Sequence, residues 1–500
     1  MYTEQRGVGY EQEAGVIVKV DAGSYYAPEY EQLSRIYNAG VPAMCEELGI
    51  AFSGMAANCW PENGSRLYID HVHPEYATPM TGSLMEGEAA RQAGERLLHG
   101  VFRHAVSRGK ISGYSLYGNV ADGMRRTTWG IHTNFELNRQ GCGINLKELP
   151  VGDVAMTNLP PAGERVIRNL SYLGMLWAVS PIFGGGGDIW FGDDGQPNFV
   201  IGAKAASLER TFGEPTTHHK PLVNRRDQPE AIDSDGVMRL HQTCCDPSSP
   251  KGNMMSTGTT NLVLDCIEHQ LLDDFPFGVD FESLYKIALG VTHDPTCRQT
   301  YEVDVRGRTI KVTANDIFYE LITRAYRLED HKDLSPDDLW TLENSVEASD
   351  IIAKDPLDLE WAAWPFKLRL LQHYFGEPAS WGRLSKEHLM KLRALNLAFD
   401  KISPDNPATS FKEMARRGIP DQRVNIPDWS SDQPPEELIQ KRMRKAPPGG
   451  RDELRGQLIA QGGCSSTGWS TVHNATGKHE LPLRPPNKIH TALEVAMSRF

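Results

Sequence analysis

Short runs of alternating polarity and longer runs with apolar residues three and four positions apart follow one another in the N-terminal part of the chain. Residues 15–20 and 65–70 have the first pattern, which is typical of strands, and residues 88–107 have the second, which is typical of a helix. A chain that mixes both periods cannot be all-helical or all-strand. The sequence therefore predicts an α+β fold.

The second half of the chain is expected to be rich in helices. Residues 260–272 and 316–328 carry apolar side chains at helical spacing. Residues 426–450 are rich in proline and charge, which is typical of a joint between two units. We therefore expect a catalytic domain at 1–410, a small C-terminal domain at 411–460 and a loose polar extension at 461–500.

The composition narrows the function. With 500 residues, 40% of them hydrophobic, the chain can bury a large core. The formal net charge of −13 does not support nonspecific binding to nucleic acid, which needs an excess of Lys and Arg. There is no long apolar run and no signal-peptide pattern at the start, so we expect a cytoplasmic protein that does not bind membranes. The eight cysteines lack C-x-x-C pairs, which favours reduced and mostly buried thiols.

The segment GYEQEAG is the first that contains residues suited to chemistry. If it forms a strand, Glu11 and Glu13 lie two positions apart and point to the same face. Two carboxylates on one face suit Mg²⁺, a hard cation that prefers oxygen ligands and keeps water molecules for phosphate oxygens. The alternative is a solvated strand face, since exposed acidic residues are the rule.

The segment NGSRLYIDHVHPEY is denser in such residues. Its Asn-Gly dipeptide predicts a turn, and the following strand would send Tyr68 and Asp70 to one face. Asp70 could act as a general base and Glu75 as a further magnesium ligand. Alternatively, His71, His73 and Glu75 are spaced by two and could bind zinc or iron, because imidazoles favour those metals. From these residues alone, a metal hydrolase, a magnesium site and a structural role all stay open.

Later polar and basic residues could contact phosphate. His132 and Asn134 in WGIHTNF are two apart and could hold a ligand together, although packing around the aromatic residues explains the segment equally well. The basic residues Arg225, Arg226 and Arg239 could grip phosphate or carboxylate through paired N–H groups, and surface salt bridges are the alternative.

Two further segments have simpler interpretations. The glycine run at 184–187 lacks the Lys and Ser/Thr of a P-loop, so it is expected to be a flexible loop. The segment STGTT at 256–260 is expected to open an apolar helix, where its hydroxyl groups would cap the helix and could face an anion. Capping alone explains that segment.

In their order along the chain, these motifs resemble the Pup ligase and Pup deamidase/depupylase family, a relative of glutamine synthetase and the carboxylate–amine ligases. GYEQEAGV is similar to the family's G-x-E-x-E-x-G pattern, NGSRLYIDHVHPEYATP to its N-G-A-R-L-Y-x-D and H-P-E-Y segments, and GIHTNF to its G-x-H-E-N-Y pattern. The likeness continues through NRRDQPEA, MRLH, STGTTNLVLDCIE and PPGGRDELRG.

The resemblance implies a glutamine-synthetase-like antiparallel sheet cradle packed with helices, with ATP at one end and a small C-terminal domain. It implies that Glu11, Glu13 and Glu75 are ligands or neighbours of a magnesium site, with Tyr68 beside them, and it makes Asp70 the catalytic aspartate. It assigns nucleotide or phosphate contacts to the residues His132, Asn134, Arg225, Arg226 and Arg239. Because the family's H-P-E-Y histidine needs no zinc, the zinc hydrolase becomes a minor alternative.

The implied activity is ATP- and magnesium-dependent formation of an isopeptide or amide bond between a glutamate side-chain carboxylate and an amine, through an acyl-phosphate. The expected partners are a Pup-like small protein, or a peptide ending in Glu or Gln, and an amine-bearing acceptor. The alternative is a nucleotide-dependent deamidase or isopeptidase, because the spacing from Asp70 to Glu75 looks like the deamidase branch. The short stretch at 55–62, where deamidases usually carry a long loop, favours the ligase.

Three departures mark the chain as a divergent member. The family's E-N-Y is Thr133, Asn134 and Phe135 here, which loses a carboxylate and a hydroxyl group. Ala14 stands where members usually have an aromatic residue, and AKAASLE replaces an R-A-D-like stretch. These changes are consistent with another substrate.

Overall fold

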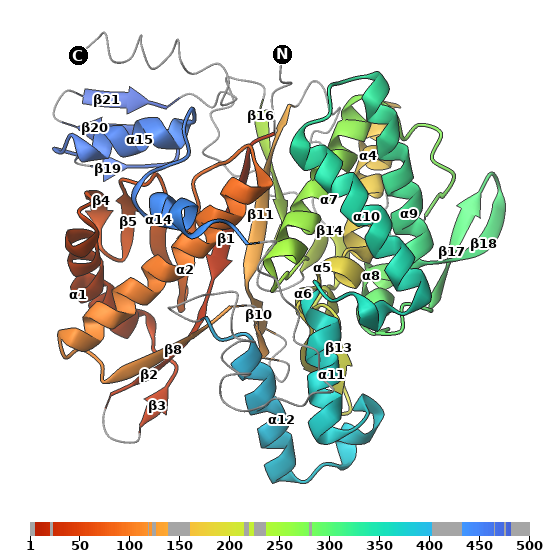
Figure 1. The fold of residues 1–500 in the computed structure, drawn as a ribbon, viewed down its shortest axis with the longest axis horizontal. Helices are drawn as coiled ribbons and strands as arrows, with labels where there is room; N and C mark the ends of the chain where they lie inside the picture. Colours follow the sequence, from red (N-terminus) through yellow and green to blue (C-terminus); the bar gives the residue numbers. More distant parts are fainter. Residues whose placement is uncertain are drawn as a thin grey trace.

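The computed structural model describes residues 6–20, 24–118, 120–122, 127–138, 161–214, 220–224, 237–279, 283–402, 433–464, 466–474 and 477–481. Arg225 and Arg226, two of the expected phosphate contacts, lie outside these ranges, as does the expected domain boundary at 410–411. Strands and helices are mixed along the described chain, so the α+β prediction is confirmed (Figure 1).

A nine-stranded sheet lies at the centre of the described structure. In order across the sheet, its strands are β14 (Arg210–Gly213), β15 (Pro221–Asn224), β16 (Val237–Gln242), β11 (Ile131–Asn138), β1 (Val8–Glu13), β7 (His73–Ala77), β6 (Arg66–Asp70), β5 (Asn58–Pro61) and β4 (Phe52–Met55). Neighbouring strands are antiparallel, except that β14 and β15 run parallel. The first strand of the chain is therefore in the middle of the sheet, between β11 and β7.

Smaller sheets surround the central one. They are formed by β2 (Gly15–Lys19), β3 (Tyr25–Tyr26) and β8 (Gly113–Tyr117); β9 (Val120–Asp122) and β10 (Thr127–Trp129); β12 (Asp188–Phe191) and β13 (Pro197–Val200); β17 (Thr300–Val305) and β18 (Arg308–Thr313); and β19 (Ser466–Thr467), β20 (Thr471–Asn474) and β21 (Gly477–Glu480). The strands expected at 15–20 and 65–70 correspond to β2 and β6.

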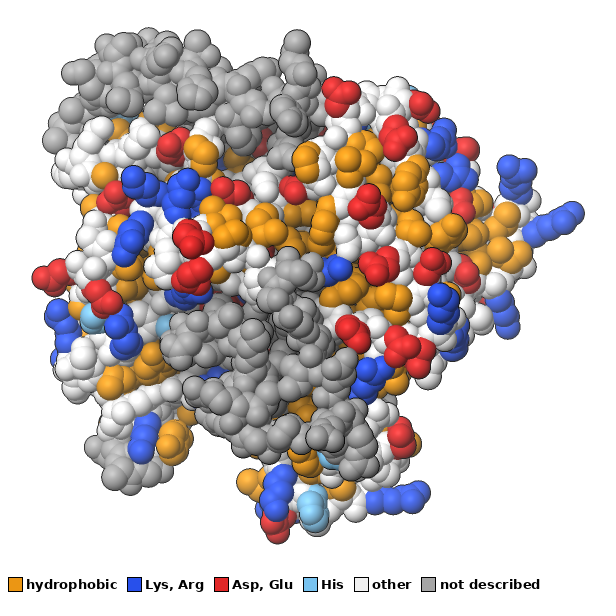
Figure 2. Space-filling view, viewed as in Figure 1, with side chains coloured by type: hydrophobic (Ala, Val, Ile, Leu, Met, Phe, Trp, Pro, Cys, Tyr) orange, Lys and Arg blue, Asp and Glu red, His pale blue; other side chains and the backbone are white. Residues whose placement is uncertain are grey.

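The helices pack around the sheets on the left and right of Figure 1, and α11 (Ala363–Phe375) and α12 (Lys386–Phe399) lie at its lower edge. They are α1 (Tyr30–Leu48), α2 (Leu84–Ser107), α4 (Pro161–Val179), α5 (Pro181–Gly184), α6 (Ala203–Ala206), α7 (Pro250–Glu268), α8 (Leu284–Thr292), α9 (Ala314–Ala325), α10 (Pro336–Lys354), α11 (Ala363–Phe375), α12 (Lys386–Phe399), α14 (Glu436–Arg444) and α15 (Arg451–Ala460). Among the described residues, no helix is long and apolar enough to cross a membrane. On the face shown in Figure 2, acidic and basic side chains are interspersed.

Helix α2 covers one face of the central sheet, where it contacts β1 and β7. Tyr10 on β1 and Tyr76 on β7 are buried and pack against glycines of this helix. A Cβ atom on Gly94 would lie 2.0 Å from Cδ1 of Tyr76, so the close contact requires glycine. Because strand side chains alternate, the neighbours of these tyrosines, including Glu11, point to the opposite face.

Helix α7 begins ten residues before the helix expected at 260–272. Ser249 is its N-cap and accepts a hydrogen bond from the Gly252 N–H at 3.0 Å, with Pro250 as the first helical residue. The expectation that residues 256–260 open the helix is wrong, because they lie buried in its interior. There the hydroxyl groups of Thr259 and Thr260 donate to backbone carbonyl groups one turn earlier.

The glycine run at 184–187 is also different from the flexible loop that was expected. These residues are buried, and a Cβ atom on Gly185 would lie 2.0 Å from the carbonyl oxygen of Ile201. Gly187 has a φ of +70° and packs against the backbone of Trp364. The run thus permits close backbone packing.

The described C-terminal residues, 433–464, 466–474 and 477–481, form a small unit that we call the C-terminal unit. Helix α15 and strands β19–β21 share a core of Leu458, Val472 and Leu481. Residues 466–474 and 477–481 belong to the polar extension expected at 461–500, and in the structure they carry strands β19–β21 with Val472 and Leu481 buried against α15. The guanidinium group of Arg455, which is completely buried, ties the unit to the main sheet by donating to the carbonyl oxygen of Gly64 at 2.7 Å.

Candidate active site

A cavity of about 1250 Å³ lies over the face of the central sheet opposite α2. Strands β1, β6, β7, β11 and β16 line it, and α12 and the C-terminal unit contribute side chains such as Arg393 and Trp469. The expected site residues that the structure describes all line this cavity: Glu11, Glu13, Tyr68, Asp70, Glu75, His132, Asn134 and Arg239. The alternation on the strands thus brings residues from distant motifs into one site.

Three carboxyl groups come together near the middle of the cavity. Glu13 on β1 lies opposite Glu75 on β7, and Tyr68 on β6 lies opposite Glu75 on its other side. Ligand oxygens of Glu13, Asp70 and Glu75 lie within 4.8 Å of one another. The Tyr68 hydroxyl group donates a hydrogen bond to Glu75. We call Glu13, Asp70 and Glu75 the acidic group.

The acidic group concentrates negative charge, which a bound cation would offset. Burial raises the pKa of Glu75 well above its usual value, and the negative charges of Glu13 and Glu11 raise it further. Burial acts on Glu13 in the same way, but the contact with His73 and nearby positive charges outweigh it and lower the pKa of Glu13. The donor set consists of oxygen atoms only, which fits Mg²⁺.

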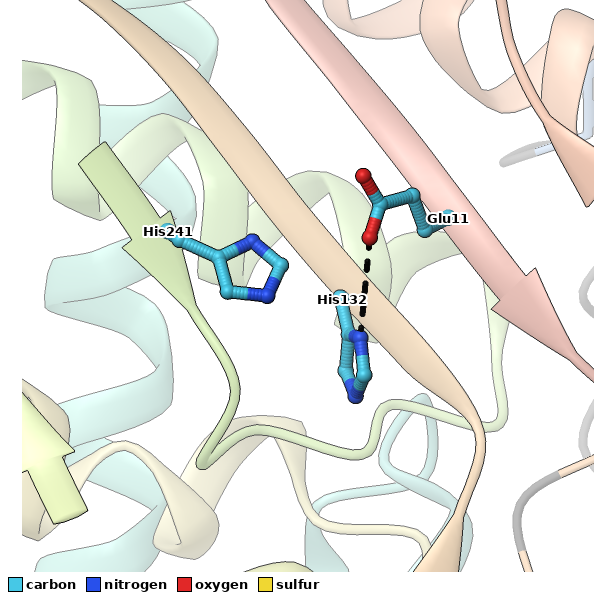
Figure 3. A group of neighbouring side chains, drawn as sticks. All are labelled: Glu11, His132 and His241. Carbon is cyan, nitrogen blue, oxygen red and sulfur yellow. Dashed lines mark ion pairs between the residues drawn. The ribbon is translucent and has the colours of Figure 1, made fainter. Parts of the chain in front are cut away.

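A second group of possible ligands contains two histidines and is shown in Figure 3. Glu11, His132 and His241 come from the three adjacent strands β1, β11 and β16, and their ligand atoms lie within 4.8 Å of one another. The Nδ1 atom of His132 is 3.8 Å from a carboxylate oxygen of Glu11. The structure therefore separates Glu11 from the acidic group, with which it was expected to bind magnesium, and places it beside imidazoles.

Asn134 holds the second group in place. Its side-chain oxygen is 2.7 Å from Nδ1 of His241, and its side-chain nitrogen donates to Glu11 at 3.2 Å. Arg239 also donates to Glu11, at 3.3 Å. Burial raises the pKa of Glu11, but His132, His241 and Arg239 outweigh burial and hold it well below its usual range. Asn134 and Arg239, expected to contact phosphate, thus have partners on the protein itself.

His71 does not share a site with His73 and Glu75. It occupies a turn with a φ of 52°, its side chain is 75% exposed, and its Nδ1 atom is 3.1 Å from Asp70. His73 faces the cavity, where Nδ1 is 3.8 Å from Glu13 and the ring packs on Trp129. Among the described residues, the zinc or iron triad considered for this segment is not brought together.

One end of the cavity carries an aromatic cluster that the motifs did not indicate. The guanidinium group of Arg66 lies over the Tyr68 ring, 4.2 Å from its centroid, and 6.0 Å from the Trp469 centroid. Trp60 packs edge-to-face on Trp469. No signal in the polar C-terminal sequence marked Trp469, because a lone tryptophan there has no period or motif around it.

Comparisons with known proteins support a family assignment. The model of the family described as Pup-ligase protein matches residues 6–473. The Pup deamidase/depupylase of Mycolicibacterium smegmatis is 29% identical over 350 residues, which cover 69% of this chain. The chain spans 64% of the length of that relative.

Two solved structures share the fold. The crystal structure of the complex between the prokaryotic ubiquitin-like protein Pup and its ligase PafA matches with a TM-score of 0.70 and 20% sequence identity, over 99% of this chain and 91% of that one. The structure of the Pup ligase PafA in complex with ADP matches with a TM-score of 0.63 and 18% identity, over 96% of each chain. The expected sheet cradle packed with helices is therefore confirmed.

Proposed function

Because the chain belongs to the Pup-ligase family, as its motifs predicted, we propose that it is an ATP- and magnesium-dependent carboxylate–amine ligase. Its substrates would be a glutamate side-chain carboxylate of a Pup-like protein or peptide and an amine on an acceptor. The observation that carries the proposal is the acidic group, with Asp70 at its edge, on the floor of a cavity large enough for a nucleotide and a peptide end. The cytoplasm is the expected location.

The residues that line the cavity support one orientation of the nucleotide. Stacking on Trp469 and Arg66 suits a nucleotide base, since bases pack well on indole and guanidinium planes. Glu13 and Glu75 would hold magnesium, which when bound offsets negative charge on phosphoryl oxygens. In the proposed arrangement the phosphate groups would lie over the centre of the sheet, and the end near Asp70 would receive the second substrate.

Asp70 is suited to the proton transfer. Its side chain is 48% exposed at the end of β6, so an amine can reach it, and it still lies within the acidic group. An amine must lose a proton to attack an activated carboxyl group, and a nearby carboxylate can accept that proton. The hydrogen bond from the Tyr68 hydroxyl group orients the Glu75 carboxylate within the acidic group.

The deamidase or isopeptidase is the second candidate. The similarity to a protein named Pup deamidase/depupylase favours it. The hairpin of β4 and β5, in which Met55 pairs with Asn58, favours the ligase, because only a tight turn stands where deamidases usually carry a long loop. The same site would serve both reactions, with Asp70 taking a proton from an amine in one and from water in the other.

Mass spectrometry of reaction mixtures tests the proposal. The protein is incubated with Mg²⁺-ATP, a lysine-containing acceptor and a Pup-like peptide that ends in Glu or in Gln. A conjugate with the Glu peptide together with ADP supports the ligase, and loss of ammonia from the Gln peptide supports the deamidase. We expect Asp70→Asn to lower either activity by at least about a hundredfold, and Asp350→Asn on the exposed face of α10 to have no effect. No product from either peptide would refute the proposed substrate class.

A further inference from the structure

Two lysines line the cavity, and among the residues that the structure describes neither has an acidic side chain within ion-pair distance. Lys204 on α6 is 3% exposed, and its Nζ atom donates to the carbonyl oxygen of Ile131 at 2.5 Å. Lys220, directly before β15, donates from Nζ to the Thr128 hydroxyl group at 2.5 Å. Each ammonium group has three donors and uses one of them on an uncharged acceptor. Within the described part of the chain, neither lysine forms an ion pair.

Such a pair is unfavourable unless an anion joins it. Burying an ammonium group without an anionic partner is costly, and two like charges near each other add to that cost. Burial lowers the pKa of Lys220 to about 8, and the neighbouring charge of Lys204 acts in the same direction. Glu13 and Asp246 attract Lys204 from beyond ion-pair distance, and Asp246 already accepts the Ala203 N–H at 2.7 Å. The two lysines therefore have donors and charge available for a ligand.

The strand directions place this pair at the reaction end of the cavity. Strands β1 and β6 run the same way, because both are antiparallel to β7. Along β6, Arg66 marks the end proposed for the nucleotide base and Asp70 the opposite end.

The two lysines line the same cavity as Asp70, near the same end of the strands but beyond β11 rather than at β6. Strand β11 runs against β1, and Ile131 at its start pairs with Gln12 near the end of β1. Thr128 lies on β10, which directly precedes β11 in the chain, and α6 packs against β10 (Figure 1). The two ammonium groups are thus anchored across the cavity from Asp70.

We propose that Lys204 and Lys220 bind the C-terminal α-carboxylate of the peptide whose terminal Glu or Gln reacts beside Asp70. The inference rests on the proposed function. A terminal residue differs from an internal one by this second carboxylate, which stays unchanged in the reaction. Two lysine donors on it would select the end of the peptide and position the side chain for attack. Lys204 belongs to the segment AKAASLE, where the chain departs from the family pattern.

Binding measurements with two matched peptides test this. A fluorescent Pup-like peptide ending in Gln is prepared with a free α-carboxylate and with an α-carboxamide, and its Kd is measured by anisotropy at saturating Mg²⁺-ADP. We expect the parent protein to prefer the free acid by about tenfold or more, as for a charge-assisted hydrogen bond. Lys204→Met and Lys220→Met should bind both peptides alike, with the Kd for ADP unchanged. Lys286→Met, on the exposed surface of α8, is the control and should keep the preference.

Three other results of these measurements would each count against the inference in a different way. Equal binding of both peptides by the parent overturns this inference alone. Weaker ADP binding by the lysine variants, with the preference for the free acid retained, overturns it in favour of a phosphate site. No binding of either peptide refutes the proposed function as well. If Lys204→Met does not fold, Lys220→Met still tests the inference, because Lys220 is only half-buried. The variants Lys204→Arg and Lys220→Arg keep the positive charge and should keep the preference for the free acid.

Discussion

Glu13 and Glu75 face each other across β1 and β7 at the point where Asp70 also approaches, and this contact defines the site at the scale of single residues. Glu75 is buried beside the charge of Glu13, which disfavours its ionised form, so a bound cation would stabilise this group. The second group, with two imidazoles and Glu11, is held by Asn134 and Arg239. The two groups share β1 but differ in donor atoms, so they suit cations of different hardness.

The acidic group leads to a prediction about magnesium. We expect Glu75→Gln to weaken Mg²⁺ binding by about tenfold or more, because it removes one of three carboxyl groups and keeps the shape. Without metal the variant should be at least as stable as the parent, since burial and neighbouring charges already raise the pKa of Glu75. Thermal unfolding in EDTA and along a MgCl₂ titration measures both effects. Glu302→Gln, exposed on β17, is the control, and an unchanged magnesium response in Glu75→Gln would contradict the assignment.

At the scale of elements, α2 fixes the position of the strands that carry the acids. Gly87 meets Tyr10 of β1, and Gly94 meets Tyr76 of β7, so the helix approaches both strands at positions without side chains. The tyrosines alternate with Glu11 and Glu75 along their strands. A shift of the helix would therefore move the carboxylates on the other face of the sheet.

We expect Gly94→Ala to destabilise the protein by about 1–3 kcal/mol, because the added methyl group overpacks the Tyr76 ring. This loss would appear although alanine is the better helix former by about 1 kcal/mol. Urea unfolding measures it through the transition midpoint. Gly100→Ala on the same helix is the matched control, because its methyl group meets the Met44 side chain, 2.9 Å from Cγ, and this unbranched chain can turn away more easily than a ring. Equal stability of the two variants would show that the contact with Tyr76 is not tight.

At the scale of the whole molecule, the C-terminal unit completes the cavity. Asp452 accepts the Met80 N–H at 2.6 Å, and Arg455 bridges Gly64 of the main sheet and the backbone of Trp469. The turn at Gly64, with a φ of +80°, leaves room for α15, since a Cβ atom there would lie 2.7 Å from the carbonyl oxygen of Asp452. Docking of the unit thus brings Trp469 to the cavity.

We expect Gly456→Ala to raise the Kd for ADP by about tenfold, which corresponds to 1.4 kcal/mol. Its methyl group would lie 2.0 Å from the carbonyl oxygen of Glu62, a backbone atom that cannot turn away, so α15 and Trp469 would be displaced. Titration with a fluorescent ADP analogue measures the change. Gly450→Ala has space for its methyl group and should bind ADP like the parent. Unchanged ADP affinity in Gly456→Ala would separate Trp469 from nucleotide binding.

The sequence by itself determined the local features and the family. The two-residue period placed Glu11 and Glu13 on the same face of β1, and Tyr68 and Asp70 on the same face of β6, because side-chain direction along a strand depends on spacing alone. Motif order indicated the family, and helical spacing located α2 and α9, although not their first turns. The start of α7 was misplaced because hydroxyl groups inside a helix and at its cap look alike in sequence.

Only the tertiary structure decided which residues meet. The pairing of β16 with β11 put His241 beside His132, and the turn between β6 and β7 left the His71 side chain exposed while His73 lies beside Glu13. Neither arrangement can be read from spacing in the chain. The docking of α15 brought Trp469 to the cavity, and the packing of α6 against β10 brought Lys204 there. These contacts depend on pairing between segments hundreds of residues apart, and such pairing follows from how the whole chain buries its apolar faces.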